Sequence, residues 1–408
     1  MFLLIGFEGA IAKCYFQQLI MNFWQNIARP VIGLSPMDGV TDPSFRFVTA
    51  KYGRPDVILT EFVNIQSAIY APEQMLKDLT YAEIERPVVA QIYGKTPALF
   101  YKVAHIVSEL GFDGLDINMG CPARKVAAAG CGAALIREPE LAHAIIQATR
   151  QGLQDWYNGQ SLEELGIRPS AIAAFRAANR RRAGIDTIAD RRLLPLSIKT
   201  RIGYDRIVVK DWISTLLEEG PAAITLHGRT LQQGYKGNAD WEAIAQAAEI
   251  AKDSGTLLLG NGDLVDMADV YRRVRECQVD GVLIGQAAEG NPWLFAGKAQ
   301  VKEALRGVGT VIPQPAANLA ERFNVMLEHS RHYENVAQNH CFVGMRKNLL
   351  WYCRGFAGAA ELQWQMKRVS SADDVEIALY NYIRSREKLF WRQPFSKILN
   401  DDAERAEQ

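Results

Sequence analysis

The 408-residue sequence predicts an α/β fold, a (β/α)8 TIM barrel, followed by a C-terminal all-helical domain. Eight short β-rich runs are separated by helical segments, which is the pattern of parallel βαβ units. Most runs begin roughly 25 to 35 residues apart, the length of a strand, loop, helix and return. The chain is also too long for one typical domain, so a large barrel and a smaller second domain account for it. A doubly wound open sheet is the alternative.

The composition is that of an ordinary globular protein, with 48% hydrophobic and 23% charged residues. Lys+Arg and Asp+Glu number 46 each, so the net charge gives no signal for nucleic acid. A nucleic-acid partner would have to bind to local basic patches. The six cysteines show no CxxC and no ligand-like spacing, which argues against a metal site and a disulfide framework. We therefore expect a cytoplasmic protein. No run approaches the ~18 apolar residues of a membrane span, so no membrane association is expected.

The sequence divides into three predicted parts. Residues 1–29 are interpreted as an N-terminal extension, and Met21 is another plausible start. The opening MFLLIGFEGAIA is apolar, but it contains Glu8 and lacks a basic segment, so a signal peptide is not favoured. Residues 30–312 form the predicted barrel, and residues 313–408, where the strand pattern has stopped, form the predicted helical domain.

The β-rich runs locate the strands and, at their ends, the candidate site. The runs are Val31–Leu34, Val57–Leu59, Val88–Ile92, Gly114–Ile117, Pro195–Ile198, Ala223–Leu226, Thr256–Leu259 and Gly281–Ile284. Catalytic groups of a (β/α)8 barrel lie at the C-terminal ends of its strands. The residues at these ends are Ser35 to Gly39, Thr60, Glu61, Gln91, Asn118, Cys121, Lys199, His227 to Arg229, Gly260 to Asp263, Gly285 and Gln286.

Cys121 is the candidate reactive group, because it stands where the fourth strand gives way to a loop. The alternative is that it is a small buried hydrophobe, the commonest fate of a free cysteine. Cys131, within a Gly-Cys-Gly turn, is interpreted as a packing residue.

Glycines after the seventh and eighth strands suit a phosphate, because glycine lets backbone N–H groups approach an anion closely. Lys199 and His227 project from neighbouring strands toward the same barrel mouth. This combination favours flavin mononucleotide over a bare sugar phosphate. The alternatives are a Lys199 paired with a core carboxylate and a structural His227.

About eighty residues separate the fourth and fifth strands, and residues 151–194 hold the surplus. The Ala-rich stretch AIAAFRAANRRR predicts a helix with a basic end, followed by Arg191 and Arg192. This insertion is either a solvated surface element or a contact for a phosphate backbone.

The chain resembles the tRNA-dihydrouridine synthase family over roughly residues 30–370. The MGCP and PMDGVTD sequences are the most specific part of the resemblance. The matching stretches are LSPMDGVTDPSFR (Leu34 to Arg46), DINMGCPARKV (Asp116 to Val126), SIKTRIG (Ser197 to Gly203), LHGRT (Leu226 to Thr230), GNGD (Gly260 to Asp263) and IGQAAEGNPWLF (Ile284 to Phe295).

The resemblance implies an FMN enzyme that takes hydride from NADPH and reduces the C5–C6 bond of a uridine in folded tRNA. By position it assigns FMN contacts to Pro36, Met37, Gln91, Lys199, His227, Asn261, Gly262, Gly285 and Gln286. The first three would hold the isoalloxazine, and the last four the phosphate. Asn118 would orient the uracil, Cys121 would donate the proton, and Arg229 would reach toward the RNA. The alternative is an FMN-dependent barrel oxidoreductase acting on a free small molecule such as a pyrimidine.

The second domain places basic residues among aromatic ones, a pattern that suits an RNA-facing helical bundle. These residues are Arg322, His329, Arg331, His332, Arg346, Lys347, Arg354, Lys367 and Arg368, with Trp351, Tyr352, Phe356 and Trp364. The resemblance implies that this domain recognises tRNA, and we select Arg346 and Lys347 as substrate contacts. An ordinary bundle with a solvated charged face is the alternative.

The sequence departs from the family pattern in three places. Gln286 stands where the family often has Arg, and Ala127 to Ala129 stand where polar residues usually follow the cysteine loop. The insertion at residues 151–194 is the third departure.

Overall fold

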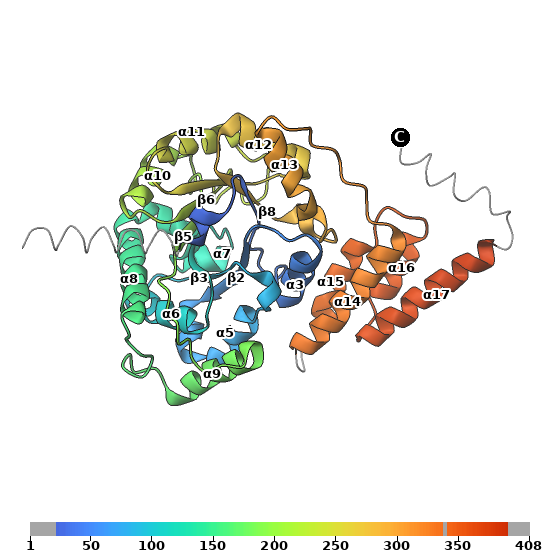
Figure 1. The fold of residues 1–408 in the computed structure, drawn as a ribbon, viewed down its shortest axis with the longest axis horizontal. Coiled ribbons are helices and arrows are strands. Elements are labelled where there is room, and N and C mark those ends of the chain that lie inside the picture. Colours follow the sequence, from blue (N-terminus) through green and yellow to red (C-terminus); the bar gives the residue numbers. More distant parts are fainter. Residues whose placement is uncertain (1–21, 338–340, 391–408) are drawn as a thin grey trace, which may run out of the picture. The chain divides into compact units, whose positions relative to one another are not determined.

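The computed structural model describes residues 22–337 and 341–390. The chain divides into two compact units, Met1–Pro315 and Ala316–Gln408, and the first is built on a closed barrel of eight strands (Figure 1). Strand β1 pairs in parallel with β8 from Val31↔Gly281 to Leu34↔Ile284, which closes the sheet on itself. The predicted (β/α)8 barrel is confirmed, and the open-sheet alternative is wrong.

Each predicted run overlaps one strand, but three strands begin one residue later than predicted and several continue further than the apolar runs. The strands are β1 (Val31–Leu34), β2 (Ile58–Asn64), β3 (Val88–Tyr93), β4 (Gly114–Met119), β5 (Leu196–Arg201), β6 (Ala223–His227), β7 (Leu257–Asn261) and β8 (Gly281–Ile284). Asn118, Lys199 and His227 therefore belong to strands rather than to the loops after them. Polar side chains at this end of the barrel form hydrogen bonds with side chains of other strands.

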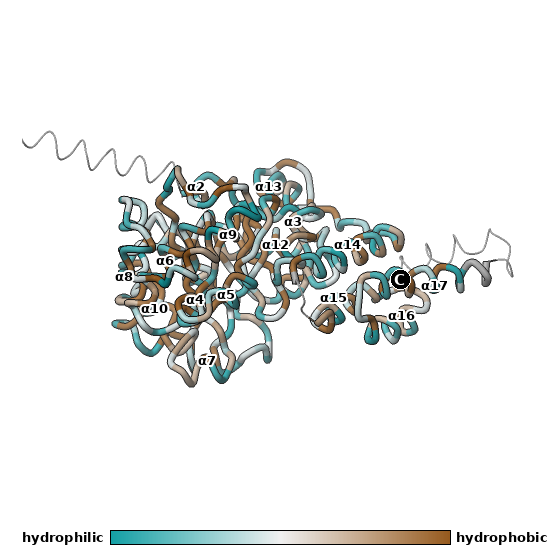
Figure 2. The backbone as a smooth tube through the Cα atoms, turned by 90° about the horizontal axis from the view of Figure 1, so that it is seen from below, coloured by the Kyte–Doolittle hydropathy of each residue, from teal (hydrophilic) through white to brown (hydrophobic). Residues whose placement is uncertain are grey.

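Helices cover the outside of the barrel and alternate hydrophobic and hydrophilic residues, as α8 does in Figure 2. The longer ones in chain order are α3 (Pro43–Tyr52), α4 (Ile65–Tyr70), α5 (Pro72–Leu79), α6 (Pro97–Glu109), α8 (Pro139–Tyr157), α9 (Pro169–Ala183), α10 (Val209–Glu218), α11 (Trp241–Ala251), α12 (Met267–Cys277) and α13 (Lys298–Leu305). In the described residues, no helix combines the length and the apolar character that a membrane span needs.

A short helix before the first strand, α2 (Phe23–Asn26), packs against the core of the barrel. Trp24 is 1% exposed and lies in one cluster with Val31, Val89 and Leu257, which come from the beginnings of strands. Residues 22–29 therefore contact the barrel core through Trp24, and the predicted division of the chain at residue 29 stays a prediction. Residues 1–21 lie outside the described residues.

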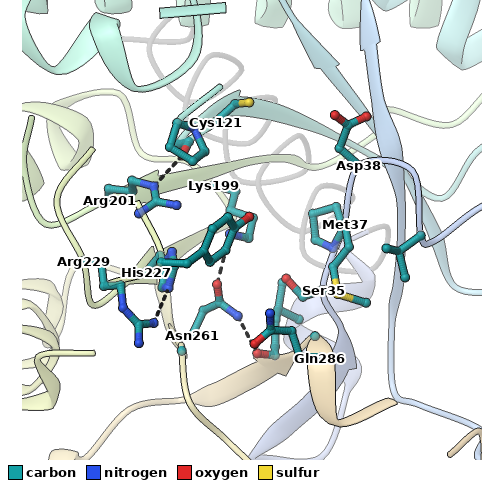
Figure 3. Close-up of a pocket in the computed structure, with 18 of the residues that line it drawn as sticks. Ser35, Met37, Asp38, Cys121, Lys199, Arg201, His227, Arg229, Asn261 and Gln286 are labelled. Atoms are coloured by element: carbon teal, nitrogen blue, oxygen red, sulfur yellow. Dashed lines mark hydrogen bonds between the residues drawn. The ribbon is translucent and has the colours of Figure 1, made fainter. Parts of the chain in front are cut away.

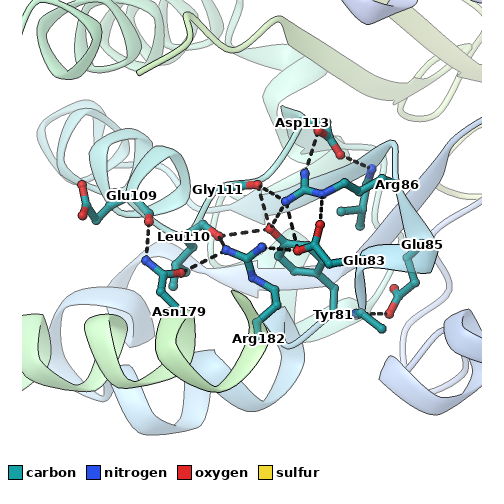
Figure 4. Close-up of polar contacts among 12 residues, drawn as sticks. Tyr81, Glu83, Glu85, Arg86, Glu109, Leu110, Gly111, Asp113, Asn179 and Arg182 are labelled. Atoms are coloured by element: carbon teal, nitrogen blue, oxygen red, sulfur yellow. Dashed lines mark hydrogen bonds and ion pairs between the residues drawn. The ribbon is translucent and has the colours of Figure 1, made fainter. Parts of the chain in front are cut away.

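The insertion contributes the last part of α8 and the whole of α9, so the predicted basic helix is present. Its side chains bind the end of the barrel where the strands begin (Figure 4). Asn179 donates to the carbonyl of Glu109, at the end of α6, at 2.8 Å. Arg182 donates to the carbonyl of Leu110 and pairs with Glu83. Arg86 joins the same cluster through Glu83 and Asp113.

Most arginines in the basic cluster of the insertion form contacts with other residues of the protein. Arg180 pairs with Asp186, and Arg191 donates to the carbonyl of Gln160 while stacking over Trp156. These partners, Asp186, Gln160 and Trp156, all belong to the insertion itself. The structure thus gives α9 a packing role.

The second unit is a set of helices: α14 (Leu319–Ala337), α15 (Val343–Tyr352), α16 (Ala359–Met366) and α17 (Ala372–Phe390). Two residues predicted to belong to its RNA-facing surface are in its core instead. His329 is fully buried with Nδ1 3.1 Å from the hydroxyl of Tyr352, which is 2% exposed. Burial lowers the pKa of His329 to about 3, so it is a neutral core residue.

Candidate active site

The barrel holds a cavity of about 860 Å³ at the carboxyl ends of its strands. Most of the residues predicted for the site line it. They are Pro36, Met37, Asn118, Cys121, Lys199, His227, Arg229, Asn261, Gly262, Gly285 and Gln286. Figure 3 shows Cys121, Lys199 and His227 on one side of the pocket, with Met37 and Asp38 across from them. Gln91 does not line the cavity, and Arg346 and Lys347 belong to the helical unit.

Cys121 lies at the edge of the cavity on the loop that follows β4, and it is 7% exposed. The side-chain oxygen of Asn118 accepts hydrogen bonds from the backbone N–H groups of Gly120 and Cys121, at 3.0 and 2.9 Å. Burial raises the pKa of the Cys121 thiol, and Asp38 acts in the same direction. The site therefore holds Cys121 as a protonated thiol at neutral pH.

Four basic side chains form one wall of the cavity: Lys199, Arg201, His227 and Arg229. Burial, followed by the charge of Arg201, lowers the pKa of Lys199 to about 8. Burial likewise lowers the pKa of Arg201 to about 10 and that of His227 well below its usual value. These groups also disfavour one another's positive charges. An anion bound here would therefore offset both the cost of burial and this mutual repulsion.

Hydrogen bonds to amide and carbonyl groups hold the basic side chains of this wall in place. Lys199 Nζ donates to Asn261 Oδ1 at 3.1 Å, and Asn261 Nδ2 donates to the carbonyl of Leu283 at 2.8 Å. Arg201 donates from Nε to the carbonyl of Gly120 at 2.7 Å and from a terminal nitrogen to that of Gly234 at 3.0 Å. Arg201 thus connects the cysteine loop to the loop after β6.

Two glycines bring backbone close to the cavity. Gly262 has φ +126°, and a Cβ there would lie 2.7 Å from Ala239 Cβ and 3.0 Å from His227 Cδ2. A Cβ on Gly285 would lie 3.0 Å from Met37 Sδ. The absence of side chains at these positions leaves room for a ligand against the backbone, as an anion site requires.

Arg229 is held by partners inside the barrel unit. One terminal nitrogen of its guanidinium contacts both carboxylate oxygens of Asp263, at 2.7 and 2.8 Å, and its Nε donates to the carbonyl of Gly237. It lies 3.3 Å from His227 Nε2 as well. The contact between Arg229 and RNA stays a prediction, and these partners account for its buried position.

Gln91 lies below the floor of the cavity, fully buried, with its side chain between Asp116 and Asn118. Sequence reasoning missed Arg201, although it stands two residues after Lys199 on the same strand and so shares its face. It also missed Tyr235, which is 70% exposed at the cavity and lies 5.8 Å from the Arg201 guanidinium. Nothing in the local sequence distinguishes Tyr235 from an ordinary loop residue.

The closed barrel and the pocket at the carboxyl ends of its strands define a (β/α)8-barrel enzyme. Residues 33–160 and 173–387 match the family model described as Dihydrouridine synthase. The chain belongs to this family of oxidoreductases.

Named relatives support the same assignment. The chain is 32% identical over 371 residues to the probable tRNA-dihydrouridine synthase 2 of Bacillus subtilis, covering 89% of this chain and 97% of the relative. It is 31% identical over 365 residues to the probable tRNA-dihydrouridine synthase of Staphylococcus aureus strain COL, covering 88% and 94%. A solved structure of DHODH from Eimeria tenella with ferulenol is similar at TM-score 0.44 and 13% identity, covering 69% of this chain and 83% of that one.

Proposed function

We propose that this protein is a tRNA-dihydrouridine synthase, an FMN-dependent enzyme that uses NADPH to reduce the C5–C6 bond of a uridine in tRNA. The observation that carries the proposal is the buried, protonated Cys121 beside a basic cavity, in a chain of this family. Two relatives that cover most of the chain carry the same name. We place the enzyme in the cytoplasm, with its tRNA substrate.

The cavity suits FMN in size, apolar surface and charge. Its 860 Å³ lies within the range of about 300–1,000 Å³ found for small-molecule sites. Pro36 and Met37 would contact the isoalloxazine, while the backbone at Gly262 and Gly285 would receive the phosphate. The bound flavin supplies reducing equivalents, taken from NADPH, to the uracil ring. Lys199 brings a positive charge to the same cavity.

The chain's own residues supply the proton and the orientation of the base. Cys121 Sγ–H donates a proton to C5 of the uracil, which general acid catalysis requires to be available at neutral pH. Lys199 and Arg201 favour the thiolate that this transfer leaves behind, because both oppose the rise in the pKa of Cys121. Asn118, fixed against the Cys121 loop, would orient the base.

A uracil in folded tRNA must be extruded to enter such a cavity, so the protein must hold the surrounding RNA. The helical unit offers exposed groups for this role. Trp364 is 59% exposed, and the guanidinium of Arg368 lies 3.5 Å from its ring centroid. The family match extends to residue 387 and so includes this unit. An enzyme acting on a free pyrimidine would have no need of it, which favours tRNA over the small-molecule alternative.

Replacing Arg346 and Lys347 together with alanine should weaken tRNA binding and flatten its salt dependence. Each lost phosphate contact should lower the slope of log K against log salt by about one. The measurement is a set of tRNA-binding titrations at several salt concentrations. A matched control removes two arginines of α9, Arg180 and Arg181, and should leave the slope unchanged. A flattened slope in the control but not in the helical-unit variant would place the RNA on the insertion.

FMN affinity should fall by about tenfold between pH 7 and pH 9, because Lys199 loses its charge through a pKa of about 8. Arg201, with a pKa of about 10, stays charged across this interval, and His227 stays neutral. The measurement is flavin fluorescence during titration of the flavin-free protein. The Lys199→Met variant should bind FMN more weakly and without this pH dependence. An equal pH dependence in the variant would assign the effect to another group.

A further inference from the structure

A buried carboxylate lies beneath the cavity and takes no part in the chemistry proposed above. Asp116 is 1% exposed on β4, in register with Gln91 on β3 and with Ser197 on β5. Ser197 Oγ donates to Asp116 Oδ1 at 2.6 Å, and Gln91 Nε2 donates to Asp116 Oδ2 at 2.7 Å. Both carboxylate oxygens are therefore engaged by neighbouring strands.

The hydrogen bonds continue from Asp116 to the cysteine loop. Gln91 Oε1 accepts from Asn118 Nδ2 at 2.9 Å, and Asn118 Oδ1 accepts from the N–H groups of Gly120 and Cys121. This series of hydrogen bonds runs in one direction: each amide directs its nitrogen toward Asp116 and its oxygen toward Cys121. A reversed Asn118 would direct an NH2 group at two backbone N–H groups, which also can only donate.

The direction of this series of hydrogen bonds depends on Asp116, the residue at its buried end. An ionised carboxylate accepts hydrogen bonds and donates none, so it admits only the nitrogen of Gln91. Burial raises the pKa of Asp116 to about 6, while Ser197, Gln91 and the charge of Lys199 act in the opposite direction. Asp116 is therefore mostly ionised at neutral pH. Lys199 is the charged neighbour facing it.

We propose that Asp116 is a positioning residue that fixes the amide orientation of Gln91 and Asn118 and, through them, the place of the Cys121 thiol. This role deepens the proposed function, because it rests on Cys121 as the proton donor. Asp116 would act without touching the substrate or the cofactor.

Two substitutions separate the hydrogen bond from the charge. Asp116→Ala and Asp116→Asn both remove the carboxylate, but asparagine keeps an oxygen for Gln91 and can direct its nitrogen to Ser197 Oγ. The readout is the alkylation rate of Cys121 with iodoacetamide, followed by peptide mass. We expect the alanine variant to alkylate about fivefold faster, the equivalent of one net hydrogen bond. The asparagine variant should stay close to the parent protein.

Cys277, a buried thiol on α12, is the internal control for general loosening of the fold. Its alkylation rate should not change in either variant. Equal acceleration at Cys277 would reduce Asp116 to a structural role. Equal changes at Cys121 in both variants would assign the effect to charge, and no change in either would also overturn the proposal.

A second test reverses the chain and does not depend on the stability of the alanine variant. Asn118→Asp alone places a carboxylate at each end of the Gln91 side chain. The carbonyl oxygen of Gln91 then faces a carboxylate oxygen, and neither can donate a hydrogen bond. Adding Asp116→Asn lets the two hydrogen bonds of the Gln91 amide form in the opposite direction, while residue 118 still accepts from the Cys121 N–H and residue 116 still accepts from Ser197 Oγ. The thermal midpoint should drop by several degrees in the single variant and largely recover in the double variant.

Losses that simply add in the double variant would overturn the proposed directionality. Both tests use thiol reactivity or unfolding and need neither flavin nor tRNA. A failure here would therefore be distinguishable from a failure of the proposed function.

Discussion

Replacing Cys121 with alanine should slow reduction of tRNA uridine by about 10²- to 10⁴-fold, the range for loss of a general acid. The reason is that C5 of the uracil would lose its positioned proton donor, the buried thiol at the edge of the cavity. Reduction of the flavin by NADPH needs no proton from this thiol and should proceed at nearly the parent rate. Stopped-flow absorbance under anaerobic conditions measures the two half-reactions separately.

The matched control is Cys131→Ala, which removes a second buried thiol from the same connection between β4 and α8. This variant should retain both half-reactions. Equal uridine reduction in the Cys121 variant and the parent would remove Cys121 from the mechanism. A parallel loss in both half-reactions would instead indicate damage to the flavin site.

Replacing Arg46 with methionine should lower the free energy of unfolding by about 3–5 kcal/mol, the cost of leaving a buried ionic partner alone. Arg46 is fully buried on α3, with Nε 2.8 Å from a carboxylate oxygen of Glu85 and a terminal nitrogen 2.8 Å from the carbonyl of Thr41. Burial raises the pKa of Glu85 even with Arg46 present. Urea unfolding followed by circular dichroism measures the loss.

Two further variants test the cause of this loss. Adding Glu85→Met should restore much of the stability, because two apolar side chains can replace a buried ion pair. Arg272→Ala breaks an exposed pair with Asp269 on α12 and should change stability by less than about 1 kcal/mol. No recovery in the double variant would mean that the contacts of Arg46 with backbone carbonyls, rather than its charge pair, account for the effect.

Arg46 also shows what sequence reasoning could and could not separate. The stretch from Leu34 to Arg46 matches the family as a whole, with PMDGVTD as its specific part, yet in the structure the stretch serves two purposes. Pro36 and Met37 line the cavity, whereas Arg46 lies in the core beside Glu85. A motif records which residues are required together, and the structure shows which of them support the site and which support the fold.

The barrel was predictable because each strand can be recognised from residues that are close together in the sequence. Each strand has an apolar run, and the runs repeat at the spacing of βαβ units, so eight strands and their order followed from pattern alone. Most site residues followed from their places at strand ends. Strand ends were underestimated where polar residues continue the sheet, as at Lys199 in β5 and Asn261 in β7.

Features that depend on long-range contacts were not predictable. Trp24 packs into the core from before the first strand, and Arg182 of α9 donates to the carbonyl of Leu110, just after α6. The chain from Asp116 through Gln91 to Asn118 requires the register of adjacent strands, which spacing does not reveal. Gln91 could be placed on its strand from sequence, but its position below the cavity could not.

The most direct test of the proposed function is a visible absorption spectrum of the purified protein, with NADPH and then unmodified tRNA added anaerobically. We expect a flavin band that bleaches with NADPH and recovers only when tRNA is added. Recovery with free uracil but not with tRNA would favour the small-molecule oxidoreductase. The absence of any flavin band, even after reconstitution with FMN, would contradict the central claim.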